Sequence, residues 1–462
     1  MTLGYVSTRG QAPELGFGDV LLAGLARDGG LYVPATWPEL DPALVGASLS
    51  YVELAQQVMW PFVDGSIPRP DFDEMVDGAY RGFRTPDVAP MVDLGDGIWL
   101  LELFHGPTLA FKDIALQLVG RLFDHELARR GERVTIVVAT SGDTGSAAIE
   151  ACRGRDAIDI VVLHPAGRVS EVQRRQMTTV REPNVHNVAI DGTFDDCQNL
   201  VKAMFNDEGF RDRQRLGALN SINWARVMAQ TVYYVWAVAR LDGARVAFSV
   251  PTGNFGNVFA GEGARRMGLA IEQFVVGSNR NDILARFFDT GRLEVSPVHP
   301  TLSPSMDIQV SSNLERLLFE INHRDGAVVA AMMDELVSTG VVSLTSEAVD
   351  ALSNRWSGAR FDDGQTLEIM ASVHAETGLL VDPHTAVGLG AAMSMRSDPD
   401  VAMVALATAH PAKFPDAVEQ ATGTRPQLPD PLGDLLERPE YCDALSNDLA
   451  EVEALVADCA RV

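Results

Sequence analysis

The chain has 462 residues, of which 46% are hydrophobic and 22% are charged, and this balance predicts folded domains rather than a disordered chain. Its formal net charge of -26 argues against a nucleic-acid or anionic-membrane partner, because such partners are bound by basic surfaces and no basic stripe is present. The length predicts two or three domains, and an anionic small substrate would need a local positive site.

The first part of the chain differs from the rest in its turn-rich segments, such as LARDGGLYVP, and it contains a helical stretch over residues 51–63. From about Arg130, short β-rich segments alternate with longer helical ones, which is typical of βαβ units in a parallel sheet. Strands are predicted at residues 133–139, 158–163, 245–250, 271–277 and 401–407.

These patterns predict an α/β protein with four segments. We expect an N-terminal domain over residues 1–95, a small α/β domain over 96–240, a large α/β domain over 241–425 and a C-terminal helical tail over 426–462. Within the tail, an acidic helix is predicted over residues 447–460.

The cysteines and the N-terminal sequence indicate the cellular compartment in which the protein is expected. The cysteines show neither CxxC pairs nor nearby His ligand spacing, so we expect reduced thiols and no metal site. They are Cys152, Cys197, Cys442 and Cys459. MTLGYVSTRG has no signal-peptide pattern, and no apolar run reaches membrane-spanning length, so we expect a cytoplasmic protein without a membrane partner.

Lys112 lies in LELFHGPTLAFKDIALQLVGRLF, where a Gly-Pro turn precedes it and an apolar-periodic helix is expected from Asp113 to Phe123. An ammonium group at the positive end of a helix dipole and beside Phe111 loses its proton more readily, as an amine that forms an imine must. Taken alone, the residue reads as an exposed lysine capping a surface turn.

Two strand-loop-helix units resemble anion sites. VTIVVATSGDTGSAAIE places backbone N–H groups, with the hydroxyls of Ser141 and Thr144, at a helix start, and VPTGNFGNVF lets the backbone curl around a phosphate. Either loop alone reads equally well as a simple turn. Together with Lys112 they indicate a pyridoxal phosphate (PLP) enzyme, with one loop for the cofactor phosphate and the other for a substrate carboxylate.

Polar residues also follow the last predicted strand, in TAHPAKF, where α/β sheets present groups to ligands. Thr408 could hydrogen-bond the pyridine nitrogen of PLP, or it could cap a helix. Arg226, in INWAR, could bind a phosphate in a bidentate way or form a surface salt bridge. His384 and Thr385 are lesser candidates, and Lys413 has no assigned role.

HGPTLAFKD, SGDTG, INWAR, PTGNFGN, DPHTAVG and TAHPAKF occur in an order that resembles the threonine synthase family over about nine-tenths of the chain. The resemblance implies a fold-type-II PLP enzyme, tryptophan synthase β-like, with two open twisted sheets flanked by helices plus an N-terminal domain. It implies that Lys112 is the Schiff-base lysine and that Thr408 faces the pyridine nitrogen. The implied phosphate cup is Gly253, Asn254, Phe255, Gly256 and Asn257.

The same resemblance implies that Ser141, Asp143 and Thr144 lie in the loop for the substrate carboxylate and that Arg226 contacts the substrate phosphate. The implied reaction, by a carbon–oxygen lyase, converts O-phospho-L-homoserine and water to L-threonine and phosphate, the last step of threonine biosynthesis. A monomer or homodimer is expected. Two alternatives are another fold-type-II enzyme, such as a serine/threonine dehydratase, and a non-catalytic binder of a phosphate ligand with the same fold.

Overall fold

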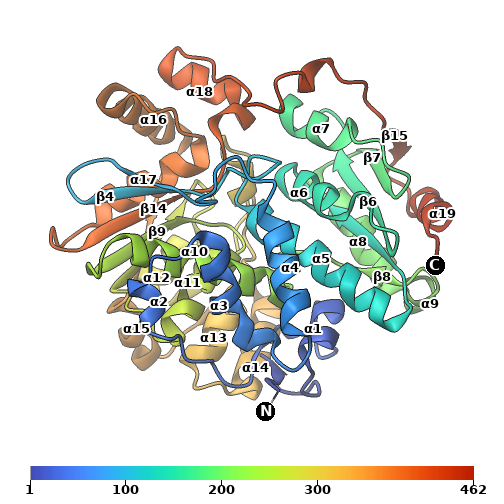
Figure 1. Ribbon diagram of the computed structural model, residues 1–462, viewed down its shortest axis with the longest axis horizontal. Helices are drawn as coiled ribbons and strands as arrows, with labels where there is room; N and C mark the ends of the chain where they lie inside the picture. Colours follow the sequence, from blue (N-terminus) through green and yellow to red (C-terminus); the bar gives the residue numbers. More distant parts are fainter. Residues whose placement is uncertain (1) are drawn as a thin grey trace.

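The computed structural model describes residues 2–462 (Figure 1). Its larger sheet has the strand order β13-β10-β9-β14-β4-β3. Its strands are parallel except β3, which pairs antiparallel with β4. The strands are β3 (Met91–Asp93), β4 (Ile98–Glu102), β9 (Val246–Pro251), β10 (Gln273–Ser278), β13 (Trp356–Arg360) and β14 (Ala402–Ala407).

The second sheet is parallel throughout, with the order β15-β7-β6-β5-β8. It contains β5 (Val134–Ala139), β6 (Ile158–Pro165), β7 (Val185–Asp191), β8 (Leu216–Gly217) and β15 (Asp443–Ser446). Two short antiparallel pairs stand apart from the main sheets: β1 (Tyr5–Ser7) with β2 (Tyr32–Pro34), and β11 (Arg292–Glu294) with β12 (Val341–Ser343).

Helices cover both faces of each main sheet, which explains why the strands are apolar on both sides. In β5, Ile136 and Val138 belong to the core shared with α5 (Lys112–Arg130) and α6 (Asp143–Cys152), whereas Val137 packs in a separate core with α8 (Phe194–Asn206) and α19 (Leu449–Cys459). In β9, Phe248 and Ala247 face two cores in the same alternating way.

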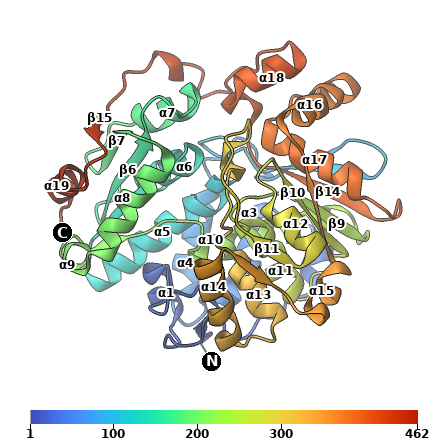
Figure 2. The ribbon, with the colours of Figure 1, turned by 180° about the vertical axis from the view of Figure 1, so that it is seen from behind.

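Helix α10 (Trp224–Arg240) lies at the centre of the molecule, and its residues 224–238 are all buried. It contacts α3 (Tyr51–Val63), α5 and α11 (Gly256–Arg266), so it joins the N-terminal helices to both main sheets (Figure 2). The other helices are α1 (Phe17–Ala23), α2 (Ala43–Gly46), α4 (Arg69–Tyr80), α7 (Glu171–Thr178), α9 (Glu208–Arg213), α12 (Ile283–Thr290), α13 (Leu314–Ile321), α14 (Gly326–Thr339), α15 (Ser346–Ser353), α16 (Asp363–Thr377), α17 (Pro383–Met395) and α18 (Pro415–Thr422).

The predicted fold class is confirmed, with two helix-flanked sheets and an additional N-terminal region. The five predicted strands are present as β5, β6, β9, β10 and β14, with ends that differ by at most two residues, and α3 spans residues 51–63 as predicted. The helix expected over Asp113–Phe123 begins one residue earlier and continues to Arg130, where Gly131 ends it in the left-handed conformation.

The strands of each main sheet come from more than one of the four segments expected from the sequence. β4, within the range 96–240, pairs with β14 in the larger sheet, and β15 of the C-terminal tail pairs with β7 in the smaller one. Figure 1 shows this red C-terminal strand beside the green β7. Among residues 2–462, no helix is long and apolar enough to cross a bilayer.

Candidate active site

A cavity lies where the loops after β9 and β14 meet the start of α5. It encloses about 560 Å³, part of which is open to solvent. Predicted site residues that line it are Lys112, Thr144, Arg226, Gly253, Asn254, Phe255, Gly256, Asn257 and Thr408. Ser141 and Asp143 do not line it. Other lining residues include Ser221, Gln230, Ser305 and His384.

Lys112 is the first residue of α5 and is 8% exposed. The segment before it is held beside the one after β14, because the Phe111 N–H donates to the Thr408 carbonyl oxygen at 2.8 Å and Ala110 forms a bridge with Ala409. Burial lowers the pKa of the Lys112 amine, although the Asp143 carboxylate opposes this effect. The arrangement favours an uncharged amine facing the cavity.

Asp113, the residue after Lys112, is fully buried and holds the turn that precedes Lys112 in place. Its carboxylate accepts hydrogen bonds from the Thr108 N–H at 2.8 Å and the Thr108 hydroxyl at 2.7 Å. A Cβ atom on Gly106 would lie 2.4 Å from the Asp113 Cβ, so glycine is needed there. Burial raises the pKa of Asp113 to about 6. HGPTLAFKD is therefore a structural unit as well as the carrier of Lys112.

Within the described residues, the loop over residues 253–257 leaves several of its backbone N–H groups free for an anion. Phe255 has a φ of 64°, and α11 begins at the next residue. The Phe255 N–H donates to the Thr252 hydroxyl at 3.1 Å, and that hydroxyl donates to Asn257 Oδ1. Within residues 2–462, the N–H groups of Asn254, Gly256 and Asn257 have no acceptor. Free donors at a helix start form a phosphate site.

Side chains from residues 305–313 support this loop. The Ser311 hydroxyl donates to the Gly253 carbonyl at 2.6 Å, and the Asn313 amide donates to the Asn254 carbonyl at 2.9 Å. A Cβ atom on Gly253 would lie 2.8 Å from the Ser305 carbonyl oxygen. The sequence suggested no site in this region, because these residues act by bracing a loop that is distant in sequence.

The SGDTG loop is fixed by Thr140, whose hydroxyl oxygen accepts from the Gly142 and Gly145 N–H groups at 2.9 and 2.8 Å. The Asp143 side chain turns away from solvent and lies 3.3 Å from Lys112 Nζ and 2.9 Å from Lys413 Nζ. Burial raises the pKa of Asp143, but the two lysines outweigh it and hold that pKa well below its usual range. Asp143 is therefore a buried carboxylate that binds lysines.

Arg226 is 4% exposed, and its guanidinium group faces the cavity. Nη1 donates to the Leu219 carbonyl at 3.0 Å, whereas Nε has no hydrogen-bond partner within the described residues. No carboxylate in residues 2–462 lies within 4.0 Å of it. Burial lowers the pKa of Arg226 to about 10. A desolvated, unpaired guanidinium group gains most from an anionic ligand.

His384 was only a lesser candidate from the sequence, yet it reaches the cavity through a fixed hydrogen-bond chain. Its Nδ1 lies 2.6 Å from Asp382 Oδ2, and its Nε2 accepts from the Ser305 N–H at 3.2 Å. This accepting role requires the Nδ1–H tautomer, which Asp382 stabilises. His384 therefore positions Ser305, whose hydroxyl lies 3.5 Å from Lys112 Nζ.

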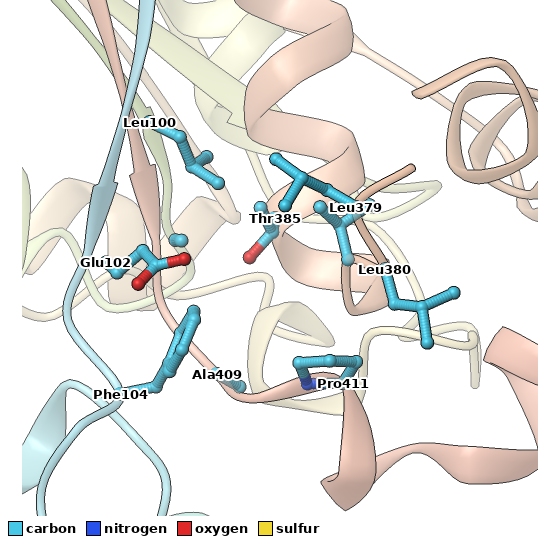
Figure 3. A pocket seen from close by; sticks show the side chains of 10 residues that line it. Leu100, Glu102, Phe104, Leu379, Leu380, Thr385, Ala409 and Pro411 are labelled. Atoms are coloured by element: carbon cyan, nitrogen blue, oxygen red, sulfur yellow. The ribbon is translucent and has the colours of Figure 1, made fainter. Parts of the chain in front are cut away.

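A second, smaller cavity of about 240 Å³ lies beside the first (Figure 3). Ala407 and Ala409 line it, whereas Thr408 between them lines the first cavity, so this segment separates the two. Figure 3 shows the Thr385 hydroxyl and the Glu102 carboxylate pointing into it. Within the described residues, the Thr385 hydroxyl has no partner.

Comparison with known proteins identifies the family. Residues 4–80 match the model of the threonine synthase N terminus, residues 85–348 that of pyridoxal-phosphate dependent enzymes, and residues 385–456 that of the threonine synthase C-terminal region. The chain is 55% identical to the threonine synthase of Pseudomonas aeruginosa, with 98% of each chain covered. It is 40% identical to that of Saccharomyces cerevisiae, with 90% of this chain and 88% of the relative covered.

The chain belongs to the threonine synthase family. Its structure matches that of a PLP-bound threonine synthase from Brucella melitensis with a TM-score of 0.97, 52% identity and full coverage of both chains. The yeast enzyme gives a TM-score of 0.93 at 37% identity, with 99% and 98% covered. As a member of this family, the chain is a PLP-dependent enzyme.

The cavity fits PLP on its own chemistry. The free N–H groups of the 253–257 loop suit a phosphate, and the Thr408 side chain lines the same space as the amine of Lys112. Lys112 and Arg226 are the only Lys, Arg, Asp or Glu side chains that line this cavity in residues 2–462. The positive site that an acidic chain would need for an anionic ligand is thus present.

Proposed function

We propose that this protein converts O-phospho-L-homoserine and water into L-threonine and phosphate, with PLP as its cofactor. The observation that carries the proposal is the cavity lined by Lys112, Arg226 and the 253–257 loop. In the part of the chain that the structure describes, Arg226 has no acidic partner, the loop has free N–H groups and no carboxylate lines the cavity. Relatives named threonine synthase, 40–55% identical over nearly the whole chain, support it.

Lys112 would hold PLP covalently through its amine, with the cofactor phosphate in the cup of residues 253–257 and Thr408 opposite the pyridine nitrogen. A hydroxyl partner leaves that nitrogen largely unprotonated. When bound, PLP supplies an electron sink that stabilises negative charge developing on substrate carbons. The Phe255 ring packs at 6.0 Å from Phe288 and 5.5 Å from Trp356, which anchors the cup.

The Lys112 amine is the proposed base that moves protons between substrate carbons. A base must be uncharged at working pH, and burial of Lys112 lowers its pKa in that direction. The Ser305 hydroxyl, 3.5 Å from Nζ, orients the amine. Because Lys112 is only 8% exposed, bulk water has little access to the reacting atoms.

The substrate would be held at two anionic ends. Its carboxylate would bind the hydroxyl of Thr144, which lines the cavity, together with the N-terminal N–H groups of α6 and the hydroxyl of Ser141, which lies in the same loop outside the cavity lining. Asp143 belongs to the same loop, but its carboxylate is engaged by Lys112 and Lys413, so its contribution to substrate would come from its backbone. The substrate phosphate would bind Arg226, because within the described residues its only hydrogen bond runs from Nη1 to the Leu219 carbonyl, which leaves the Nε and Nη2 hydrogens as donors.

Phosphate release from O-phospho-L-homoserine tests the proposal directly. Wild-type protein should release phosphate and form L-threonine in equal amounts. Lys112→Ala should lower the rate by about a thousandfold or more, since it removes both the cofactor linkage and the base. Lys202→Ala, an exposed lysine on α8, is the matched control and should retain full rate. No release by the wild type would refute the function.

The cytoplasmic location and the monomeric or homodimeric state remain predictions from the sequence. Gel filtration with light scattering would determine the oligomeric state.

A further inference from the structure

Lys413, which has no role in the proposed chemistry, is fully buried next to the active site. Its side chain is 0% exposed and does not line the cavity. Its Nζ donates to the Thr108 carbonyl at 2.7 Å and lies 2.9 Å from Asp143 Oδ1. Lysine side chains are seldom fully buried, and burying an ion pair costs desolvation energy, so the burial of Lys413 with Asp143 indicates a specific role.

The Asp143 carboxylate is shared between two lysines. Oδ1 contacts Lys413 and also accepts from the Gln173 amide at 2.8 Å. Oδ2 contacts Lys112 Nζ at 3.3 Å and accepts from the Ser305 hydroxyl at 3.1 Å. No other carboxylate in residues 2–462 lies within 4.0 Å of either lysine. One negative charge therefore faces two amines.

A buried carboxylate can neutralise one ammonium group, and a second ammonium beside it remains uncompensated. Lys413 has the shorter contact with Asp143 and a second hydrogen bond to a carbonyl, so it is the more closely bound partner of this carboxylate. We propose that Lys413 is a positioning residue: it pairs with Asp143 and so leaves Lys112 as an uncharged amine directed into the cavity.

The other charged or titratable groups near Lys112 are consistent with this role. Arg226 on α10 adds positive charge, and His384 on α17 lies near Asp143 with its Nδ1 bound to Asp382. Burial has the largest effect and lowers the pKa of Lys112; Asp143 raises it, and Lys413 and Arg226 lower it further. Without Lys413, Asp143 would pair with Lys112 alone and favour the charged amine.

The inference rests on the proposed role of Lys112, but its test does not depend on turnover. Acetic anhydride acetylates only uncharged amines, and the chain contains three lysines, so peptide mass spectrometry can follow each one. In the full-length PLP-free protein, Lys413→Met should raise the apparent pKa of Lys112 by about one unit, so its labelling slows by up to about tenfold at pH values low enough to protonate the wild-type amine in part. Lys202 provides the internal reference, and Lys202→Met should leave Lys112 unchanged.

The double variant Asp143→Asn/Lys413→Met shows whether a change in Lys112 labelling comes from the lost ion pair or from a folding defect. It replaces both members of the ion pair with neutral residues, so Lys112 should be labelled at a rate within about twofold of wild type. In Asp143→Asn alone, Lys112 should be labelled faster than in wild type, because the carboxylate that favours its charged form is gone. It also provides the test if Lys413→Met does not fold. Unchanged Lys112 labelling in a folded Lys413→Met variant, or a tenfold change in the double variant, would overturn the inference.

The holoenzyme provides an independent readout. In Lys413→Met, the acidic limb of the pH profile of kcat should move about one unit to higher pH, because Lys112 is a free amine only in the substrate-bound enzyme. A loss of rate that is equal at every pH would show a purely structural role and contradict the inference. If the wild type takes up PLP but releases no phosphate, the proposed reaction fails while the labelling result still decides the role of Lys413.

Discussion

The cofactor cup and the lysine cluster form two sides of the same site and are built in opposite ways. The cup over residues 253–257 consists of consecutive residues that offer backbone N–H groups without a charged side chain. The cluster of Lys112, Asp143 and Lys413 consists of three charged side chains from distant segments, buried around one carboxylate.

This difference determines how the cup and the cluster respond to changes of pH and to substitutions. Backbone donors do not titrate, so the cup should bind an anion over a wide pH range and depend mainly on shape. The cluster depends on which amine carries the proton, so it should be sensitive to charge and pH. The following substitutions test this contrast, beginning with the largest expected effect.

Gly253→Ala should weaken PLP binding about tenfold to a hundredfold. The added Cβ would lie 2.8 Å from the Ser305 carbonyl oxygen and 3.1 Å from the Met306 Cα, so the loop must shift, at a cost of about 1–3 kcal/mol. The affinity can be measured by titrating PLP-free protein and following visible absorbance. Gly82→Ala is the control, because its Cβ would meet nothing within 4 Å. Equal affinities for both variants would show that shape does not govern the cup.

The contrast also explains what the sequence could predict. The cup and the start of α5 are local: a glycine-bearing turn between strand and helix, and a lysine at a helix start, are visible within about ten residues. The residues that brace the cup, Ser311 and Asn313, were missed because their contacts with Gly253 and Asn254 are set by tertiary packing.

The charged cluster could not be predicted for the same reason. Lys413 occurs in TAHPAKF, but its burial and its pairing with Asp143 depend on how η2 (Pro411–Lys413) docks against the smaller sheet's loops. Asp143 was expected in a carboxylate-binding loop, and only the structure shows that its side chain faces two lysines. Likewise, the lack of an acidic partner for Arg226 among residues 2–462 is a property of three-dimensional packing.

His410 lies three residues before Lys413, and its protonation can be followed as a loss of stability at low pH. Its Nδ1 accepts from the Ala412 N–H at 3.1 Å, and burial, with Arg84 and His105 nearby, lowers its pKa to about 4. The unfolded chain therefore binds a proton near pH 6.5 that the folded state does not, and stability falls as pH drops from 6.5 towards 4. His410→Asn, which keeps an acceptor for Ala412, should lack this loss.

The expected difference is about 1–2 kcal/mol between pH 6.5 and pH 5.0, measured by urea unfolding of wild type and variant at both values. His323→Asn is the control: His323 is exposed and has a φ of 55°, which asparagine tolerates. If His410→Asn and wild type lose the same stability between the two pH values, the partly buried His410 imidazole is not a source of acid sensitivity.

Thr385→Val should give the smallest effect, because it alters the second cavity, which belongs to neither side of the site. The Thr385 hydroxyl is buried without a partner in the described residues, so replacing it with a methyl group should stabilise the fold by up to about 1 kcal/mol. Thr366→Val is the matched control, since the equally buried Thr366 hydroxyl donates to the Asp362 carbonyl at 2.8 Å. Its loss should cost about 1 kcal/mol. Thermal unfolding of both variants measures the difference, and equal destabilisation would show that the Thr385 hydroxyl is satisfied in solution by water held between it and Glu102.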